Sequence, residues 1–281
     1  MGLGGHLTWT AVFRELKHKK LDNDTKILPC EIFQNKITKI ISNDLFSNNP
    51  HVYVSSKDLG KKVFAVPLNL PQTNYCKRDT PQRAFHRYDK HIIAQICEFY
   101  GIESPVLKCE LYFIEEEHKN IASLVRNLNN NFIVIEPHSK MNYTPNRVYP
   151  FEKWQSVVDE ISKHAQVVQV GRKGNQVLSG VVDFTGKTSF KEAALLIGKS
   201  KLFVSTEGGL VHAATAVDTK SVVVMTGYQD KKMVAYPQNI NIDIANHGPC
   251  GLKVPCKLCQ KDAESHDYKI IVDKIMDHPG A

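Results

Sequence analysis

A pair of glycines between an acidic residue and a histidine is the feature of this sequence most suited to ligand chemistry. Glu207-Gly-Gly-Leu-Val-His212 follows the run Leu202–Ser205 after a single residue, Thr206. Glycines let the backbone approach a ligand closely, and the free N–H groups of a following helix attract phosphate. Glu207 is then suited to accept hydrogen bonds from sugar hydroxyls, and His212 to donate one to phosphate. The alternative is that Gly208 and Gly209 only form a tight turn over a packed histidine.

A basic residue follows another apolar run, Phe132–Glu136. Pro137-His-Ser-Lys140 comes next, and Arg147 stands just before a helical pattern that begins at Phe151. The planar guanidinium matches phosphate oxygens, so Arg147, together with Ser139, is a candidate for anion binding at the end of this strand. The alternative is a surface arginine near the start of a helix.

A third segment, Asp183-Phe-Thr-Gly-Lys-Thr-Ser189, places an ammonium group and hydroxyls before a further helical pattern. Lys187 and Thr188 are the candidates for contact with an anion. The segment is not a phosphate-binding P-loop, because the Gly-x-x-x-x-Gly-Lys spacing is absent, and Ser189 is equally suited to cap the helix.

Three cysteines and a histidine gather near the C-terminus: His247, Cys250, Cys256 and Cys259. Their types and the Cys-x-x-Cys spacing suit a tetrahedral zinc or iron site, while reduced thiols without a metal are the alternative. We expect any such metal to be structural, because these residues follow the predicted sheet and lie away from the three segments above. Seven cysteines without a secretory context argue against a disulfide framework.

Composition narrows the class of protein. With 42% apolar and 23% charged residues in 281, the chain reads as soluble, globular and long enough for two domains. No apolar window is long enough for a membrane span, and the first residues do not resemble a signal peptide, so we expect a cytoplasmic protein. The net charge of +7 attracts anions in general. Aromatic residues do not interleave with the basic ones, which disfavours nucleic acid as a partner.

Strand and helix patterns alternate clearly from residue 132 onward. Such alternation predicts an α/β fold with a doubly wound parallel sheet and ligands at the carboxyl ends of its strands. We expect strands at Phe132–Glu136, Gln166–Val170, Leu202–Ser205 and Ser221–Met225, and helices at Phe151–Lys163, Thr188–Ser200 and Leu210–Val217.

The N-terminal half shows a weaker alternation. We expect helices at Thr8–Lys17 and Pro81–Tyr100, strands at Lys26–Cys30 and His51–Ser55, and a charged boundary at Glu115–Asn131. The predicted domains are residues 1–125 and residues 126–281.

Taken together, the three ligand segments resemble the C-terminal half of glycosyltransferase family 9, the ADP-heptose:lipopolysaccharide heptosyltransferases. The resemblance covers most of residues 130–240, and Gly2-Leu-Gly-Gly-His-Leu resembles the glycine-rich loop that opens these enzymes. It implies a GT-B fold of two Rossmann-like domains facing a cleft, with the donor in the second domain and Gly4 and Gly5 on the acceptor side. It also implies inverting transfer of a heptose or similar sugar from a nucleotide-diphosphate sugar, without a cofactor for the chemistry. The acceptor would be a hydroxyl of a glycan or a lipid-linked, lipopolysaccharide-like molecule. A lipid-linked acceptor would imply peripheral contact of the protein with the inner membrane face.

The departures from the family concern catalysis. Family members usually have a strand before the glycine-rich loop, whereas this chain starts inside that loop, so we expect the first strand of the N-terminal domain to be missing. The catalytic aspartate of the family corresponds to Gly5, and His6 is the nearest residue able to accept a proton. Glu207 replaces an aspartate and Arg147 a lysine, which retains both charges. Two alternatives stay open: a catalytically impaired relative that still binds nucleotide sugars, and a sugar-nucleotide epimerase.

Overall fold

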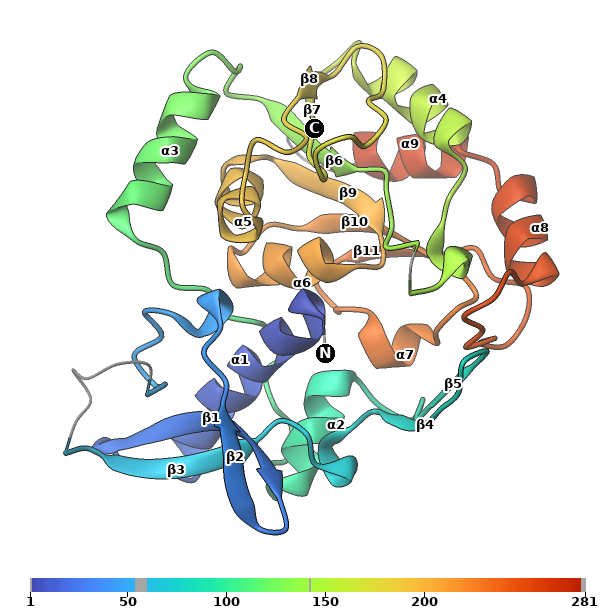
Figure 1. The fold of residues 1–281 in the computed structure, drawn as a ribbon. Helices are drawn as coiled ribbons and strands as arrows, with labels where there is room; N and C mark the ends of the chain where they lie inside the picture. The colour runs from blue at the N-terminus through green and yellow to red at the C-terminus, as the bar shows by residue number, and fades with distance from the viewer. Residues whose placement is uncertain (1, 54–59, 142, 279–281) are drawn as a thin grey trace.

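The larger part of the molecule is built on a six-stranded sheet in the order β11-β10-β9-β6-β7-β8 (Figure 1). The structure, a computed structural model, describes residues 2–53, 60–141 and 143–278. Every pairing in this sheet is parallel. The strands are β6 (Phe132–Glu136), β7 (Gln166–Gln169), β8 (Val182–Asp183), β9 (Leu202–Thr206), β10 (Ser221–Met225) and β11 (Ile240–Asp243). The predicted α/β fold with a parallel sheet is therefore confirmed.

Helices cover both faces of this sheet. Val223 and Met225 of β10 belong to the apolar core on one face, and Val222 and Val224 to the core on the other, so the strand is buried on both sides as its all-apolar sequence predicts. The first face carries α5 (Phe190–Lys199) and α6 (Gly209–Ala216), and the second carries α4 (Phe151–Ile161) and α9 (Lys269–Met276).

A three-stranded sheet in the order β2-β1-β3 forms the N-terminal part. The strands are β1 (Thr25–Phe33), β2 (Lys36–Ile40) and β3 (Lys62–Pro67), and β1 pairs parallel with β3 and antiparallel with β2. Helix α1 (Leu3–Lys19) lies between this sheet and α6 (Figure 1). Gly2 is the only described residue before α1, so the absence of a preceding strand stays a prediction. Of the predicted strand His51–Ser55, Val52 forms one parallel bridge to Ile27, and residues 54 and 55 lie outside the described chain.

The helix predicted for Pro81–Tyr100 is wrong over its first half. Strands β4 (Cys76–Asp79) and β5 (Ala84–His86) form an antiparallel hairpin, and α2 (Ile92–Phe99) begins only afterwards. The backbone N–H of Ala84 donates to the carbonyl of Gly251, and that of Lys253 donates to the carbonyl of Gln82. These distant backbone partners hold the segment extended, and local hydrophobic spacing carries no information about them.

The stretch predicted as a charged boundary contains a helix, α3 (Glu115–Val125). It packs against α5 of the larger part, where the buried ammonium of Lys191 lies 3.0 Å from the carboxylate of Glu117. The division at residues 125 and 126 stays a prediction. The described residues also form α7 (Lys231–Val234) and α8 (Lys257–Ser265), and short 3-10 helices at Asp44–Phe46, Pro71–Thr73 and Pro145–Arg147.

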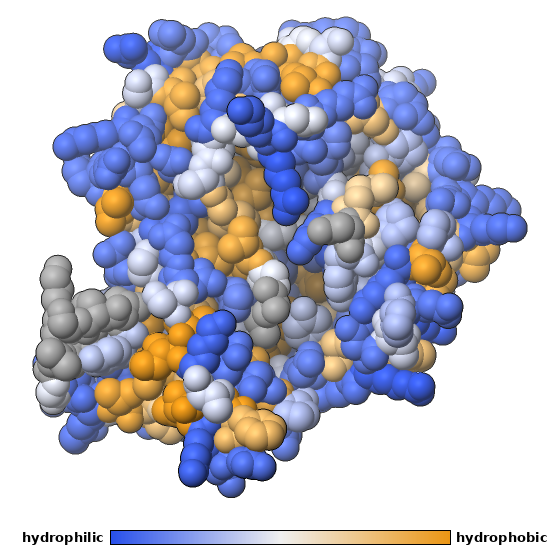
Figure 2. Space-filling model, in the orientation of Figure 1, coloured by the Kyte–Doolittle hydropathy of each residue, from blue (hydrophilic) through white to orange (hydrophobic). Residues whose placement is uncertain are grey.

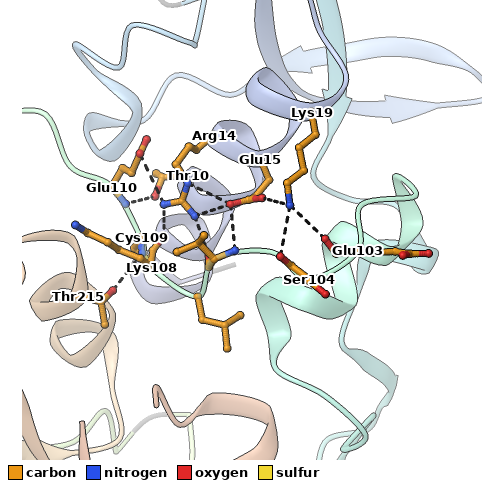
Figure 3. Close-up of polar contacts among 12 residues, drawn as sticks. Thr10, Arg14, Glu15, Lys19, Glu103, Ser104, Lys108, Cys109, Glu110 and Thr215 are labelled. Atoms are coloured by element: carbon orange, nitrogen blue, oxygen red, sulfur yellow. Dashed lines mark hydrogen bonds and ion pairs between the residues drawn. The ribbon is translucent and has the colours of Figure 1, made fainter. Parts of the chain in front are cut away.

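Residues 106–109, in the segment that joins the N-terminal part to the larger part, are hydrogen-bonded to a helix of each part (Figure 3). Arg14 of α1 donates to the carbonyls of Val106 and Lys108, each at 2.8 Å. The backbone N–H of Cys109 donates to the hydroxyl of Thr215 in α6, at 3.2 Å. The surface is hollowed between the N-terminal part and the larger sheet (Figure 2). In the described chain, no helix combines the length and the apolar character needed to cross a membrane.

Candidate functional site

An ion pair between Arg147 and Glu207 joins two of the predicted ligand segments. Thr144 caps the short helix that ends at Arg147, and Glu207 directly follows β9. The Nε of Arg147 lies 2.9 Å from Oε2 of Glu207, but its proton is not aligned with the carboxylate, so charge and not a hydrogen bond holds the pair. Nη2 of Arg147 donates to the side-chain oxygen of Gln229, which follows β10. The cluster therefore assembles at the carboxyl edge of the parallel sheet, where such sheets bind ligands.

Aromatic rings from both parts of the molecule surround this arginine. Its guanidinium carbon lies 4.8 Å from the ring centre of Tyr228 and 5.7 Å from that of Tyr143. His86, from the β4–β5 hairpin, contacts Tyr228 edge to face and stacks on Tyr75. Burial, with a smaller contribution from the Arg147 charge, lowers the pKa of His86 to about 4. The N-terminal part thus contacts the aromatic ring that lies against Arg147.

The glycine pair meets the start of helix α1. Gly208 caps α6 with extended backbone, and a Cβ added to Gly4 would lie 3.1 Å from the Cα of Gly209 and 3.1 Å from the ring of His212. A Cβ added to Gly209 would lie 3.4 Å from the ring of Phe190, at the start of α5. Glycine at position 4 therefore permits the close contact of α1 with α6 beside the ion pair, whereas a Cβ at position 209 would make an ordinary van der Waals contact with α5.

His212 lies beneath the turn and is buried. Its Nε2 lies 4.0 Å from Oε1 of Glu207, and its Nδ1 lies 2.7 Å from the hydroxyl oxygen of Tyr236. Burial, and then the positive charge of Arg147, lowers the pKa of His212 to about 4. The imidazole is therefore neutral near neutral pH.

The other predicted donor-binding residues are Ser139, Lys187 and Thr188, and no contact between them and Arg147, Glu207 or His212 is seen among the described residues. The exposed ammonium of Lys187 donates to the carbonyl of Asp183 at 2.5 Å and lies over the ring of Phe184. Thr188 is half-buried next to Ser189, the N-cap of α5. The hydroxyl of Ser139 is buried and has no hydrogen-bond partner among the described residues.

His6, the candidate base, is engaged by Asn43. The Oδ1 of Asn43 accepts from the backbone N–H of Leu45, so its amide nitrogen must donate to Nδ1 of His6, 3.0 Å away. Burial, and then the N-terminal ammonium, lowers the pKa of His6, so the ring is neutral and its proton lies on Nε2. In this arrangement His6 has no free lone pair, and its action as a base requires the bond to Asn43 to break. Gly5 supplies no carboxylate.

Three of the four predicted metal ligands, His247, Cys256 and Cys259, lie within reach of one ion. One ring nitrogen of His247 and the two sulfurs lie within 4.8 Å of one another. The sulfur of Cys259 lies 3.5 Å from that of Cys250 and 3.6 Å from Nε2 of His247. Tetrahedral coordination with ordinary zinc bond lengths places two sulfurs about 3.8 Å apart and a sulfur and a nitrogen about 3.6 Å apart.

Polar neighbours set the protonation of these ligands. Nδ1 of His247 donates to the carbonyl of Gly248 at 2.6 Å, and Nε2 lies 3.6 Å from the sulfur of Cys259 and 3.5 Å from a carboxylate oxygen of Asp262. The hydrogen bond between the two sulfurs lowers the pKa of Cys250 to about 6 and raises the pKa of Cys259, so Cys250 supplies a thiolate more readily than Cys259 does. A thiolate is the form that binds a metal.

The prediction that the cysteines lie away from the ligand segments is wrong. The side-chain oxygen of Asn146 accepts from the backbone N–H of Cys256 at 2.8 Å, and its amide nitrogen donates to the carbonyls of Leu252 and Val254. The next residue is Arg147, and Tyr228, which lies under its guanidinium, packs against the cysteines. The loop that carries the cysteines thus contacts both Asn146, the neighbour of Arg147 in the chain, and Tyr228, whose ring lies against the guanidinium.

Two small cavities flank this support. One of about 160 Å³ is lined by residues after β10 and β11, including Gly227, Gln229 and His247. The other, of about 200 Å³, lies between Asn146 and Cys259 and does not reach the glycine turn. Gln229, which lines the first cavity, accepts a hydrogen bond from Arg147, so the first cavity adjoins the ion pair.

Sequence reasoning missed Tyr143, Tyr228, Gln229 and Tyr236. Tyr228 and Gln229 follow β10, the most apolar strand, and this position alone was a usable signal. No local pattern marks Tyr236, because its partner His212 lies on a different element.

Comparisons with known proteins agree with this geometry. The family model described as glycosyltransferase family 9 (heptosyltransferase) matches residues 79–260. A solved family 9 glycosyl transferase from Veillonella parvula is 14% identical, with a TM-score of 0.62 over 86% of this chain and 82% of that one. The iron-containing dodecameric glycosyltransferase TibC from enterotoxigenic E. coli is 16% identical, with a TM-score of 0.61 over 99% and 73%.

The ADP-heptose LPS heptosyltransferase II of E. coli is 14% identical, with a TM-score of 0.51 over 66% of this chain and 61% of that one. These likenesses show a shared GT-B fold. A comparison with curated protein sequences gave no match.

Proposed function

Because this chain belongs to glycosyltransferase family 9, we propose that it transfers a heptose or similar sugar from a nucleotide-diphosphate sugar to a hydroxyl group, with inversion. The acceptor is a glycan or a lipopolysaccharide-like molecule. A solved relative, TibC, is described in complex with ADP-D-beta-D-heptose, which makes ADP-heptose the first donor to test.

The observation that carries this proposal is the cluster of Arg147, Glu207 and His212 beside the glycine turn. Nη2 of Arg147 donates to Gln229, and its Nε lies beside the carboxylate of Glu207. Both partners lie at the carboxyl edge of the sheet. Its cationic fork would stabilise the charge that develops on the leaving diphosphate. Glu207 would hold sugar hydroxyls, and the neutral His212 would donate to a phosphate oxygen.

The test is titration calorimetry with ADP-heptose, ADP and an unrelated nucleotide sugar, followed by a transfer assay on a glycan acceptor. We expect ADP-heptose to bind and Arg147→Ala to weaken that binding. Equal affinity of wild type and Arg147→Ala for the donor would remove Arg147 from the site. Absence of binding by every nucleotide sugar would overturn the proposal.

A second candidate is a relative that binds nucleotide sugars without turnover. It is favoured by Gly5 at the position of the family aspartate and by the engagement of His6 with Asn43. Donor binding by calorimetry without transfer or hydrolysis would support it. Turnover that is abolished by His6→Gln would instead support the transferase with His6 as base.

We also propose a structural zinc or iron ion held by His247, Cys250, Cys256 and Cys259. The sulfur–sulfur and sulfur–nitrogen separations described above fit a tetrahedral metal, and the structurally similar TibC is described as iron-containing. The metal would fix the loop behind Arg147. None of the transfer chemistry requires it.

The acceptor places the protein near a membrane surface if it is lipid-linked. We propose a cytoplasmic enzyme that contacts the inner membrane face transiently, drawn by its net charge of +7. Co-sedimentation with vesicles that contain phosphatidylglycerol, compared with neutral vesicles, tests this contact. Equal recovery with both vesicle types would exclude an electrostatic attraction.

A further inference from the structure

Tyr236 contacts His212 at the ring nitrogen that does not face Glu207. Its hydroxyl oxygen lies 2.7 Å from Nδ1 of His212 and 3.4 Å from the sulfur of Cys109. Tyr236 is 1% exposed, and its ring packs against that of His91, 4.8 Å away between ring centres. Residues of the N-terminal part, the joining segment and the larger part therefore fix the position of one hydroxyl group.

The surroundings of His212 decide which ring nitrogen carries the proton. Nε2 faces Oε1 of Glu207 at 4.0 Å, and a carboxylate paired with Arg147 only accepts hydrogen bonds. A lone pair on Nε2 would face this carboxylate and be repelled. The proton therefore lies on Nε2, and the lone pair of Nδ1 accepts from the hydroxyl of Tyr236.

We propose that Tyr236 is a positioning residue that fixes His212 as an Nε2–H donor toward the diphosphate of the sugar donor. This inference rests on the proposed function, and it assigns His212 the role of a hydrogen-bond donor and not of a base. The hydroxyl of Tyr236 acts only through the imidazole and does not contact the sugar or the nucleotide.

Activity measurements separate this role from simple packing. We expect Tyr236→Phe to lower kcat/KM about tenfold, the effect of losing roughly one hydrogen bond, mostly through kcat. A glutamine at position 212 carries its donor nitrogen without any choice of tautomer. In the His212→Gln background, Tyr236→Phe should therefore change kcat/KM by less than about twofold. An equal loss in both backgrounds would make Tyr236 a packing residue and overturn the proposal.

Tyr149 provides a matched control outside the site. It is equally buried, and its hydroxyl lies 3.0 Å from Nδ1 of His266, on the opposite face of the sheet from α6. Tyr149→Phe removes the same kind of hydrogen bond. We expect it to leave kcat/KM and the ring signals of His212 unchanged.

The tautomer itself can be measured without any activity. Long-range proton–nitrogen NMR spectra distinguish protonated from unprotonated ring nitrogens, and loss of signals in His212→Gln identifies those of His212. We expect a protonated Nε2 and an unprotonated Nδ1 in the wild type, and a mixture of tautomers in Tyr236→Phe. A proton on Nδ1 in the wild type would overturn the proposal even if the protein is a transferase. The expected tautomer in a protein without transferase activity would leave this inference standing and remove only the proposed function.

Discussion

The Nε of Arg147 lies 2.9 Å from Oε2 of Glu207, and the two side chains are only 18% and 9% exposed. The residues proposed to bind the diphosphate and the sugar of the donor thus form a buried ion pair with each other. Each charge stabilises the other out of water, so removing one leaves the other unpaired.

Arg147→Ala should weaken donor binding roughly 10- to 100-fold, the usual effect of losing hydrogen bonds from a charged group. It should also destabilise the fold by about 3 kcal/mol, because Glu207 is left buried without a partner. Calorimetry and denaturant unfolding measure the two effects. In the double variant Arg147→Ala/Glu207→Gln, stability should partly return while donor affinity stays low. If affinity returned together with stability, Arg147 would not contact the donor.

The free energy of unfolding should fall as the pH is lowered from 7 to 5. Burial lowers the pKa of His86 and of His212 to about 4, so in this range the unfolded chain binds protons that the folded chain does not. Stability is therefore fully present above about pH 6.5 and decreases below it, by up to about 1.4 kcal/mol per pH unit for each histidine. Urea unfolding at several pH values tests this. The pH dependence should be shallower in His212→Gln, and an unchanged dependence would contradict the burial of a neutral His212.

Purified protein should contain about one zinc or iron ion per chain, and Cys256→Ser should lose it. The melting temperature should fall with the metal, because the loop behind Arg147 loses its anchor. Elemental analysis and thermal unfolding measure the two changes. Cys76→Ser is the control, since Cys76 lies on the β4–β5 hairpin outside the cluster. Equal metal content in both variants would show that the cluster is not the binding site.

Gly251→Ala should destabilise the protein far more than Gly180→Ala. Both glycines have positive φ angles, +60° and +78°, so alanine costs about 1–2 kcal/mol at either position. At Gly251 the added Cβ would also lie 2.3 Å from the carbonyl oxygen of Ala84, whereas at Gly180 nothing lies within 4 Å. We expect the extra cost at Gly251 to exceed about 2 kcal/mol in denaturant unfolding, because the contact between the hairpin and the cysteine loop must open. Similar losses in the two variants would show that this contact contributes little to stability.

The strands of the larger sheet and the glycine turn could be predicted from the sequence, because their signals are local. An apolar run such as Ser221–Met225 is buried on both faces wherever the sheet places it, and Gly208 and Gly209 suit a strand-to-helix turn on their own account. The ligand types near the C-terminus, three cysteines and a histidine, were equally readable. The order of the segments was sufficient to indicate the family.

What the residues do together was decided only by the tertiary structure. Asn146 and Cys256 are 110 positions apart, and their hydrogen bond brings the cysteine loop behind Arg147. The β4–β5 hairpin is extended because Gly251 and Lys253 supply its backbone partners. Tyr236 is hydrogen-bonded to His212 of a different element, and the amide of Asn43 donates to the lone pair on Nδ1 of His6. Contacts of this kind depend on strand order and on how separate helices pack, and no hydrophobic period or short motif encodes them.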